Sequence, residues 1–206
     1  MSKKKAKKKG TIFTWIGILF FLAALGLTAY NEWDGWRANQ ASQKIVKELD
    51  KEIPGKPENQ PGWDENREMP TKTINGYKYI GTLYIPKLKL KLPVMASWNY
   101  DKLKIAVCRY SGSVYKNNMV IAGHYYARHF SPVKRLPIGT KIVFTDVEGF
   151  KYTYNIGWKE VLQPEETKAM VSKGKNEQWD LTLFTCTTGG SSRATMRCIS
   201  KKLHYK

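Results

Sequence analysis

Residues 179–193 read WDLTLFTCTTGGSSR, an apolar run that ends in a cysteine and continues into a turn-forming segment. A short apolar run bounded by such a segment predicts a buried strand. Its side chains alternate between two faces, with Leu181, Leu183 and Thr185 on one and Thr182, Phe184 and Cys186 on the other. A thiol at the end of this strand is held rigidly yet lies within reach of a substrate. Cys186 is therefore a candidate nucleophile.

A cysteine nucleophile needs a base, because a free thiol with a pKa of about 8.5 is mostly protonated at neutral pH. Two of the three histidines lie in VIAGHYYARHF, residues 120–130. His124 follows an apolar strand and a glycine, so its placement mirrors that of Cys186, and the two would meet if their strands were parallel neighbours. His129 lies deeper in the loop and His204 lies close to the C-terminus. His124 is therefore the candidate acid/base.

An acyl-transfer site also needs a group that stabilises the oxyanion, and two arginines closely follow the cysteine. Arg193 and Arg197 face the same way on a strand but lie about 13 Å apart, at roughly 3.3 Å per residue. If residues 187–192 form a hairpin loop, Arg193 falls opposite Cys186 and Arg197 falls near Thr182. This geometry favours Arg193 as the stabilising residue, with Arg197 as the alternative.

The apolar pattern changes from helical spacing to alternation near residue 77, where YKYIGTLYIP begins. Alternation with period two predicts strands. Further strands are expected at 88–92, 118–122, 141–145, 150–158, 180–185 and 193–200, with a hairpin turn at Glu148 and Gly149 and short helices at 100–107 and 164–173. Seven or eight strands with little helix predict a mostly β fold, either a closed barrel or a sandwich.

The first thirty residues predict a membrane anchor. Residues 1–10 contain six lysines, and the twenty residues from 11 to 30 contain no charge. A stretch of this length can span a bilayer, whereas a cleaved signal peptide, the alternative, usually has an apolar core of about 7–15 residues. The lysines would keep the N-terminus in the cytoplasm of a single-pass protein and place the rest of the chain outside the cell membrane.

The segment that follows has the composition of a stalk. A modest helical pattern between residues 38 and 53 gives way to prolines and glycines interleaved with charges, which is typical of a linker. The expected organisation is a basic cytoplasmic leader at 1–10, a transmembrane signal anchor at 11–30, an extracytoplasmic stalk at 31–72 and a catalytic domain at 73–206.

Charge and cysteine content limit the other classes of function. The formal net charge is +18, and it is still +12 without the six lysines of the leader. There is no Cys-x-x-Cys pair and no tight cluster of histidine and cysteine, so we expect no metal and no other cofactor. Cys108 and Cys198 are either two separate buried thiols or a disulfide, which an exported domain permits.

Three motifs together resemble the sortase family, over roughly residues 74–200: TLFTC at 182–186, AGH at 122–124 and RATMR at 193–197. The resemblance implies a sortase-type eight-stranded closed β-barrel with short helices, in which the histidine- and cysteine-bearing strands are parallel neighbours. It implies Cys186 as nucleophile, His124 as acid/base and Arg193 as oxyanion stabiliser, with Ala122 and Thr185 lining the substrate groove. The six residues between Cys186 and Arg193 make a short loop for this family.

The resemblance also implies a reaction and its partners. Sortases cleave the C-terminal sorting signal of secreted surface proteins, hold the product as a thioacyl enzyme and transfer it to an amine of the Gram-positive cell wall or of a pilin. The partners implied are sorting-signal proteins and a peptidoglycan-precursor or pilin amine, and the features favour a class B-like or class D-like enzyme. The alternatives are a secreted cysteine peptidase that hydrolyses its substrate and a non-enzymatic module that binds a wall polymer. We expect no nucleic-acid partner.

Overall fold

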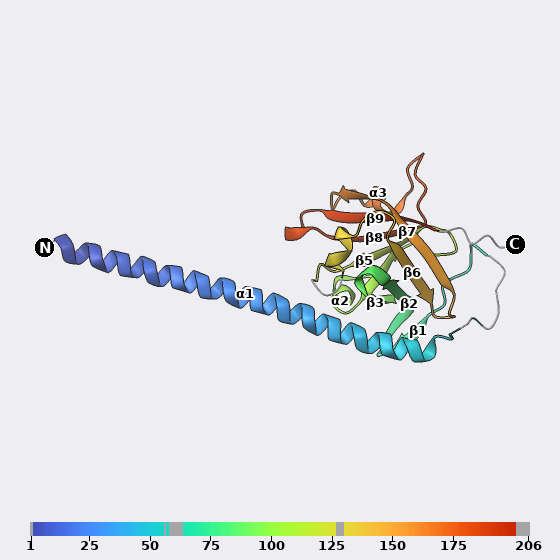
Figure 1. Cartoon of the computed structure of the whole chain (residues 1–206), viewed down its shortest axis with the longest axis horizontal. Helices are drawn as coiled ribbons and strands as arrows, with labels where there is room; N and C mark the ends of the chain where they lie inside the picture. The colour runs from blue at the N-terminus through green and yellow to red at the C-terminus, as the bar shows by residue number, and fades with distance from the viewer. Residues whose placement is uncertain (1, 56, 58–63, 127–129, 201–206) are drawn as a thin grey trace. The chain divides into compact units, whose positions relative to one another are not determined.

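The computed structural model describes residues 2–55, 57, 64–126 and 130–200, with the backbone alone for 2–9 and 188; His129 and His204 lie outside this part. The helices are α1 (Ser2–Glu52), α2 (Tyr100–Leu103) and α3 (Thr167–Val171), and the 3-10 turns are η1 (Pro86–Leu88), η2 (Ser131–Arg135) and η3 (Thr188–Gly190). The strands are β1 (Lys72–Ile74), β2 (Tyr77–Ile85), β3 (Leu90–Met95), β4 (Val107–Ser111), β5 (Met119–Gly123), β6 (Lys141–Asp146), β7 (Lys151–Leu162), β8 (Leu181–Cys186) and β9 (Arg193–Ser200) (Figure 1).

Strands β2 to β9 form a closed barrel. Their order is β2-β3-β4-β5-β8-β9-β7-β6, β6 pairs again with β2, and β1 extends the sheet beside β2. The closing pairs include Thr82 opposite Thr145 and Leu83 opposite Phe144. A sandwich would leave these two edges unpaired, so the structure selects the barrel from the two predicted architectures. The predicted eight-stranded closed β-barrel is confirmed for the described part of the chain.

The barrel core is built from alternate residues of each strand. Leu83, Phe144 and Leu183 are fully buried and belong to one continuous apolar cluster inside the barrel. Because side chains alternate along a strand, the neighbours of Leu183 on β8 face outward. Phe184 accordingly packs against a separate cluster that contains Trp179 and lies over the outer surface of the barrel. Cys186 shares the outward face with Phe184.

Two predicted helices are shorter than the sequence indicates. The helix expected at 100–107 ends at Leu103, and Val107 already begins strand β4. The helix expected at 164–173 is reduced to Thr167–Val171. The predicted hairpin turn is present between β6 and β7, where Gly149 adopts a positive φ of 90°.

The compact unit that contains the barrel begins at Ala38, so it includes the second part of α1. Ile45 and Leu49 are buried in a cluster with Tyr79, Met95 and Cys108, on the outer surface of the sheet. The side chain of Gln43 donates a hydrogen bond to the backbone carbonyl of Lys91 at 3.0 Å. Part of the predicted stalk, residues 31–72, therefore packs as a helix against the strands.

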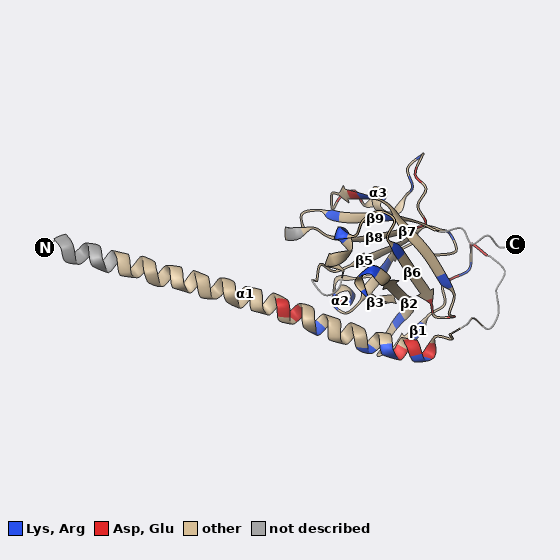
Figure 2. Ribbon diagram, in the orientation of Figure 1, with Lys and Arg blue, Asp and Glu red and all other residues tan. Residues whose placement is uncertain are grey.

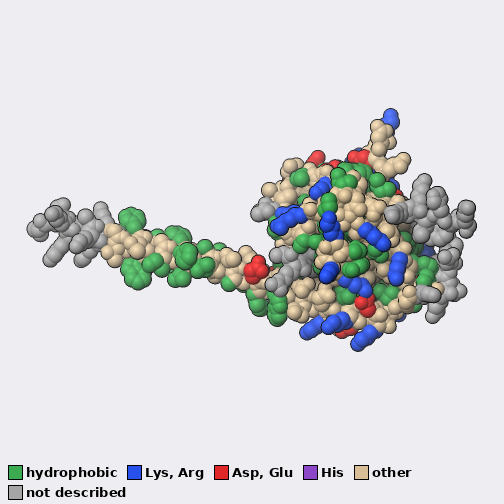
Figure 3. Space-filling model, in the orientation of Figure 1, with side chains coloured by type: hydrophobic (Ala, Val, Ile, Leu, Met, Phe, Trp, Pro, Cys, Tyr) green, Lys and Arg blue, Asp and Glu red, His purple; other side chains and the backbone are tan. Residues whose placement is uncertain are grey.

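The first part of α1 has a different character. Its large apolar side chains between Ile12 and Trp36 are exposed, and no charged residue occurs between residues 10 and 31. Figure 2 shows this uncharged stretch beside the mixed charges near the end of α1, and Figure 3 shows apolar side chains along it. By length and composition the helix could cross a membrane, and the predicted anchor at 11–30 lies within it.

The packing of α1 predicts a measurable contribution to the stability of the barrel. Leu49 is fully buried, so Leu49→Ala should lower the free energy of unfolding of a protein comprising residues 38–206 by about 2–5 kcal/mol. Lys47 is exposed on the same helix, and Lys47→Ala should change it by less than about 0.5 kcal/mol. Urea unfolding followed by tryptophan fluorescence measures both. Equal effects of the two substitutions would show that the helix does not pack on the strands in solution.

Candidate functional site

Cys186 is the last residue of β8, and its side chain is partly exposed on the outer face of the barrel. Strand β8 lies between β5 and β9 in the sheet. The buried residues Leu181 and Leu183 hold the strand from the inside, so the backbone that carries the thiol is fixed by the core. The thiol is thus rigidly supported and accessible from outside.

His124 lies beside Cys186 because β5 and β8 are parallel neighbours. Gly123 pairs with Thr185 in this register, and His124 and Cys186 are the next residues of the two chains. The backbone N–H of Tyr125 donates to Nδ1 of His124 at 2.9 Å, and the ring of Tyr126 lies 4.2 Å from the imidazole, centre to centre. Nδ1 of His124 is thus engaged by the backbone of its own loop.

Gly123 sets the position of the histidine through a close contact with Phe130. A Cβ atom at position 123 would lie 2.2 Å from the ring of Phe130, so a larger residue has no room here. Phe130 is fully buried in the barrel core. The buried ring therefore packs directly against the backbone that precedes His124 and fixes the end of β5.

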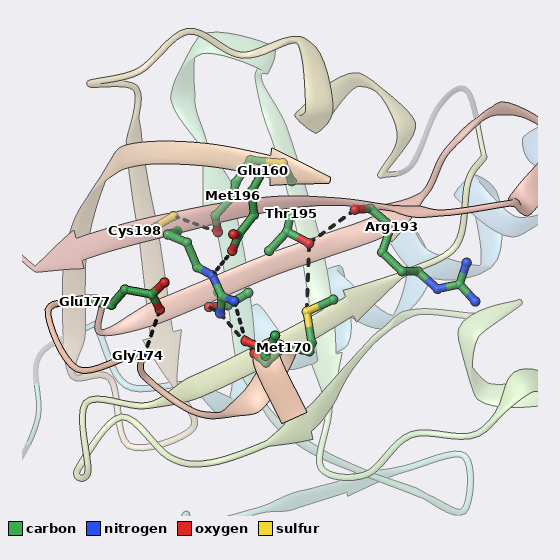
Figure 4. Close-up of polar contacts among 11 residues, drawn as sticks. Glu160, Met170, Gly174, Glu177, Arg193, Thr195, Met196 and Cys198 are labelled. Atoms are coloured by element: carbon green, nitrogen blue, oxygen red, sulfur yellow. Dashed lines mark hydrogen bonds and ion pairs between the residues drawn. The ribbon is translucent and has the colours of Figure 1, made fainter. Parts of the chain in front are cut away.

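Arg193 begins β9 and pairs with Cys186 across the antiparallel ladder. The loop between them is closed by the backbone N–H of Thr187, which donates to the carbonyl of Ser192 at 2.9 Å. Nη1 of Arg193 donates to the carbonyl oxygens of Gly190 at 3.0 Å and Ser192 at 3.2 Å. The guanidinium is thus bound to the carbonyls of its own loop, and Figure 4 shows it pointing away from Met170.

Arg197 occupies a different environment on the same strand. It pairs with Thr182, as the hairpin geometry predicts, and its side chain is only 1% exposed. Its Nε donates to Oε1 of Glu160 at 2.6 Å. Arg197 therefore lies well below the end of the strand at which Cys186 is found, and Arg193 is the arginine that pairs with Cys186 in the ladder.

A cavity of about 300 Å³ opens at this end of the three strands. Cys186, His124, Arg193 and Ala122 all contribute to its lining. Thr185 does not line it: the side chain points to the barrel interior, beside Leu183, and is 1% exposed. Alternation along β8 is the reason, because Thr185 and Cys186 are neighbours and must face opposite sides.

The two side walls of the cavity were not identified from the sequence. Trp98 and Tyr110 lie with ring centres 5.0 Å apart at a tilt of 34°, and Tyr110 meets Phe184 edge to face at 5.3 Å. Thr167 and Met170 of α3 also line the cavity. The sequence gave no signal for these contacts, because Trp98 lies in the loop between β3 and α2, and Tyr110 meets Phe184 only through the pairing of β4 with β5 and of β5 with β8.

The other two cysteines are buried, unpaired thiols. Burial raises the pKa of Cys108 to about 12, and burial also raises the pKa of Cys198 well above its ordinary value. Both thiols therefore stay protonated at neutral pH and are poor nucleophiles. Among the described residues, no group of three or more metal-binding side chains is found.

Comparisons with known proteins give the following matches. The model of the sortase domain family matches residues 83–201, whereas no curated protein matches the chain. Sortase C1 of Streptococcus suis is 24% identical, with a TM-score of 0.50, over 59% of this chain and 72% of that one. A Clostridium perfringens sortase C, solved with the C-terminal cell wall sorting motif, is 22% identical, with a TM-score of 0.51, over 61% and 71%.

A further similar structure is the sortase D5 transpeptidase of Clostridium perfringens. It is 22% identical, with a TM-score of 0.53, over 63% of this chain and 82% of that one. At these identities the three structures show a shared fold, and the family follows from the domain match.

The difference among the three thiols predicts selective alkylation. Iodoacetamide at pH 8 should modify Cys186 in the folded protein, because its side chain is partly exposed while Cys108 and Cys198 are buried and have raised pKa values. Peptide mapping by mass spectrometry would locate the adduct. The Cys186→Ala variant should take up no label until it is denatured. Native labelling of either buried cysteine would contradict the burial described above.

Proposed function

Because this chain belongs to the sortase family, we propose that it is a cysteine transpeptidase that cleaves a sorting signal through a thioacyl enzyme. The product would pass to an amine of the cell wall or of a pilin. The observation that supports this proposal most directly is the common position of Cys186, His124 and Arg193. They lie at one end of three adjacent strands and line one cavity.

In the proposed first step, the sulfur of Cys186 attacks the scissile carbonyl carbon. The thiol proton passes to His124 as the sulfur attacks, and the bond to the leaving amine breaks as the imidazolium of His124 donates that proton to the departing nitrogen. The acyl group is then held as a thioester. In the second step the incoming amine attacks the thioester and His124 accepts a proton from it. The carbon–sulfur bond then breaks, and the Cys186 sulfur takes the proton back from His124, which restores the thiol.

Arg193 is proposed to stabilise the oxyanion that forms in both steps. Its guanidinium starts each turnover on two carbonyl oxygens of the β8–β9 loop. These carbonyl oxygens are neutral dipoles, whereas the oxyanion carries a developing negative charge, which attracts the guanidinium more strongly. Exchanging the carbonyls for the oxyanion therefore favours the transition state over the free enzyme.

The proposed placement in the cell follows from α1. The lysine-rich residues 1–10 would stay in the cytoplasm, residues 11–30 would anchor the protein, and the barrel would act outside. The predicted catalytic domain at 73–206 is proposed to work together with Ala38–Glu52, because this helical segment covers apolar residues of the barrel. The substrates implied are sorting-signal proteins and an envelope amine.

Mass spectrometry of peptide products tests the transpeptidase. Residues 38–206 would be incubated with a library of peptides that carry threonine at the scissile position, with and without oligoglycine or diaminopimelate. Wild type should give amine-ligated products, and Cys186→Ala and His124→Gln should each give none, since nucleophile and acid/base are both required. Products of hydrolysis alone, at every amine concentration, would instead favour a cysteine peptidase.

Arg193 can be tested separately from the thiol and the imidazole. Arg193→Gln should reduce kcat for the cleaved peptide by about 10²–10³, the usual loss when an oxyanion donor is removed. Arg135→Gln is the matched control, because Arg135 is exposed on η2 and does not line the cavity. Steady-state kinetics on the two variants gives the comparison. An unchanged kcat in Arg193→Gln would remove Arg193 from the mechanism.

A further inference from the structure

A single buried arginine ties helix α3 to the barrel. Arg197 on β9 donates from Nε to Glu160 on β7 at 2.6 Å and from Nη1 to Oγ1 of Thr182 on β8 at 2.8 Å. Nη1 also donates to the carbonyl oxygen of Met170 at 3.0 Å, and Nη2 donates to that of Ala169 at 2.6 Å. One guanidinium therefore contacts β7, β8 and the last turn of α3. Figure 4 labels two of its partners, Glu160 and Met170.

Helix α3 needs such a contact because it is too short to be stable alone. It has five residues, whereas isolated helices shorter than about 12–15 residues are marginal in water. The amide of Ser172 donates to the carbonyl of Lys168, but the carbonyls that follow it are among those that a helix end leaves without an intrahelical donor. Arg197 supplies donors to two of them, and its positive charge is favourable at a helix C-terminus. A side chain from a distant strand thus acts as the C-terminal cap of α3.

The position of α3 matters because it forms one wall of the cavity. Met170 and Thr167 line the cavity, and Met170 is also held by Thr195, whose hydroxyl donates to the methionine sulfur at 3.9 Å. Trp98 and Tyr110 line the same cavity, and Tyr110 packs against the apolar cluster that contains Met170. A shift of α3 therefore changes the shape of the cavity that a substrate at Cys186 would occupy.

We propose that Arg197 is a positioning residue that fixes α3 as a wall of the substrate cleft and so sets the affinity for the peptide substrate. The proposal rests on the proposed function, since it names the same cavity as the peptide site. Lysine cannot replace arginine in this role. Its single ammonium lacks the planar fork that reaches a carboxylate, a hydroxyl and two carbonyls from one place. Arg197 does not touch the reacting atoms, so its loss should leave the chemical step intact.

The test compares Arg197→Lys and Arg197→Met in the full-length protein in detergent, with Lys168→Met as the control. Lys168 is exposed on α3 itself, so the control removes a cation from the same helix without altering its contacts with the barrel. Hydrogen exchange followed by mass spectrometry measures the amides of Met170 and Ser172, which donate within α3, and the amides of β8. Kinetics uses the threonine peptide that wild type cleaves.

Both Arg197 variants should exchange the α3 amides at least about 10-fold faster than wild type, with β8 unchanged. Their KM should rise by about 10-fold while kcat stays within about 2-fold, the pattern of lost ground-state binding. Lys168→Met should match wild type. The rate of alkylation of Cys186 by iodoacetamide should be the same in all four proteins, which reports an intact β8.

Three results would overturn the proposal. In the first, α3 keeps its wild-type protection in both variants, which means that Arg197 does not hold it. In the second, β8 and α3 lose protection together, which makes Arg197 a general stabiliser of the barrel. In the third, kcat falls while KM is unchanged, which places Arg197 in the chemistry. If wild type cleaves no peptide, the proposed function fails, and the exchange measurement still decides whether Arg197 holds α3.

Discussion

The parallel pairing of β5 with β8 is the constraint on which the site depends. With Gly123 opposite Thr185, both strands end at the same level, and the residues that follow, His124 and Cys186, emerge on the same outer face. A slip of one residue in either strand would turn one of these side chains into the barrel. The register cannot slip easily, because Leu183 is buried inside the barrel and the ring of Phe130 packs on Gly123.

The closed barrel and the cleft walls differ in how they are held. The barrel strands are joined by ladders around the whole circumference, and the thiol and imidazole lie at the ends of two of these paired strands. The wall formed by α3 has five residues and depends on a few side-chain contacts from β9. This division places the reacting groups on a fixed frame and the groups that surround the substrate on a separately supported segment. Such a segment can vary without disturbing the reacting groups.

The sequence predicted the features that depend on local pattern. The strand ending at Cys186, the strand before His124 and the hairpin that opposes Arg193 to Cys186 all follow from alternation and turn residues. The inward face of Thr185 was also visible in the alternation, which groups it with Leu183. The walls of the cavity were not predictable, because Trp98 and Met170 belong to segments that meet only after the barrel closes. The packing of α1 was missed for the same reason, since its apolar stripe needs the outer surface of β3 and β4.

Arg193 and Arg197 show how the same residue type takes different roles on one strand. Both lie on the outward face of β9, four positions apart. Arg197 is 1% exposed and its guanidinium lies 4.7 Å from the ring centre of Trp179, so its donors need partners inside the protein. Moving it would leave Glu160 and two carbonyls of α3 without their donor. Arg193 lies at the solvent-accessible end of β9, and its two carbonyl acceptors can accept hydrogen bonds from water when the guanidinium moves away. The cost of moving a guanidinium is therefore low at Arg193 and high at Arg197, which suits the first to follow a developing charge and the second to hold a wall in place.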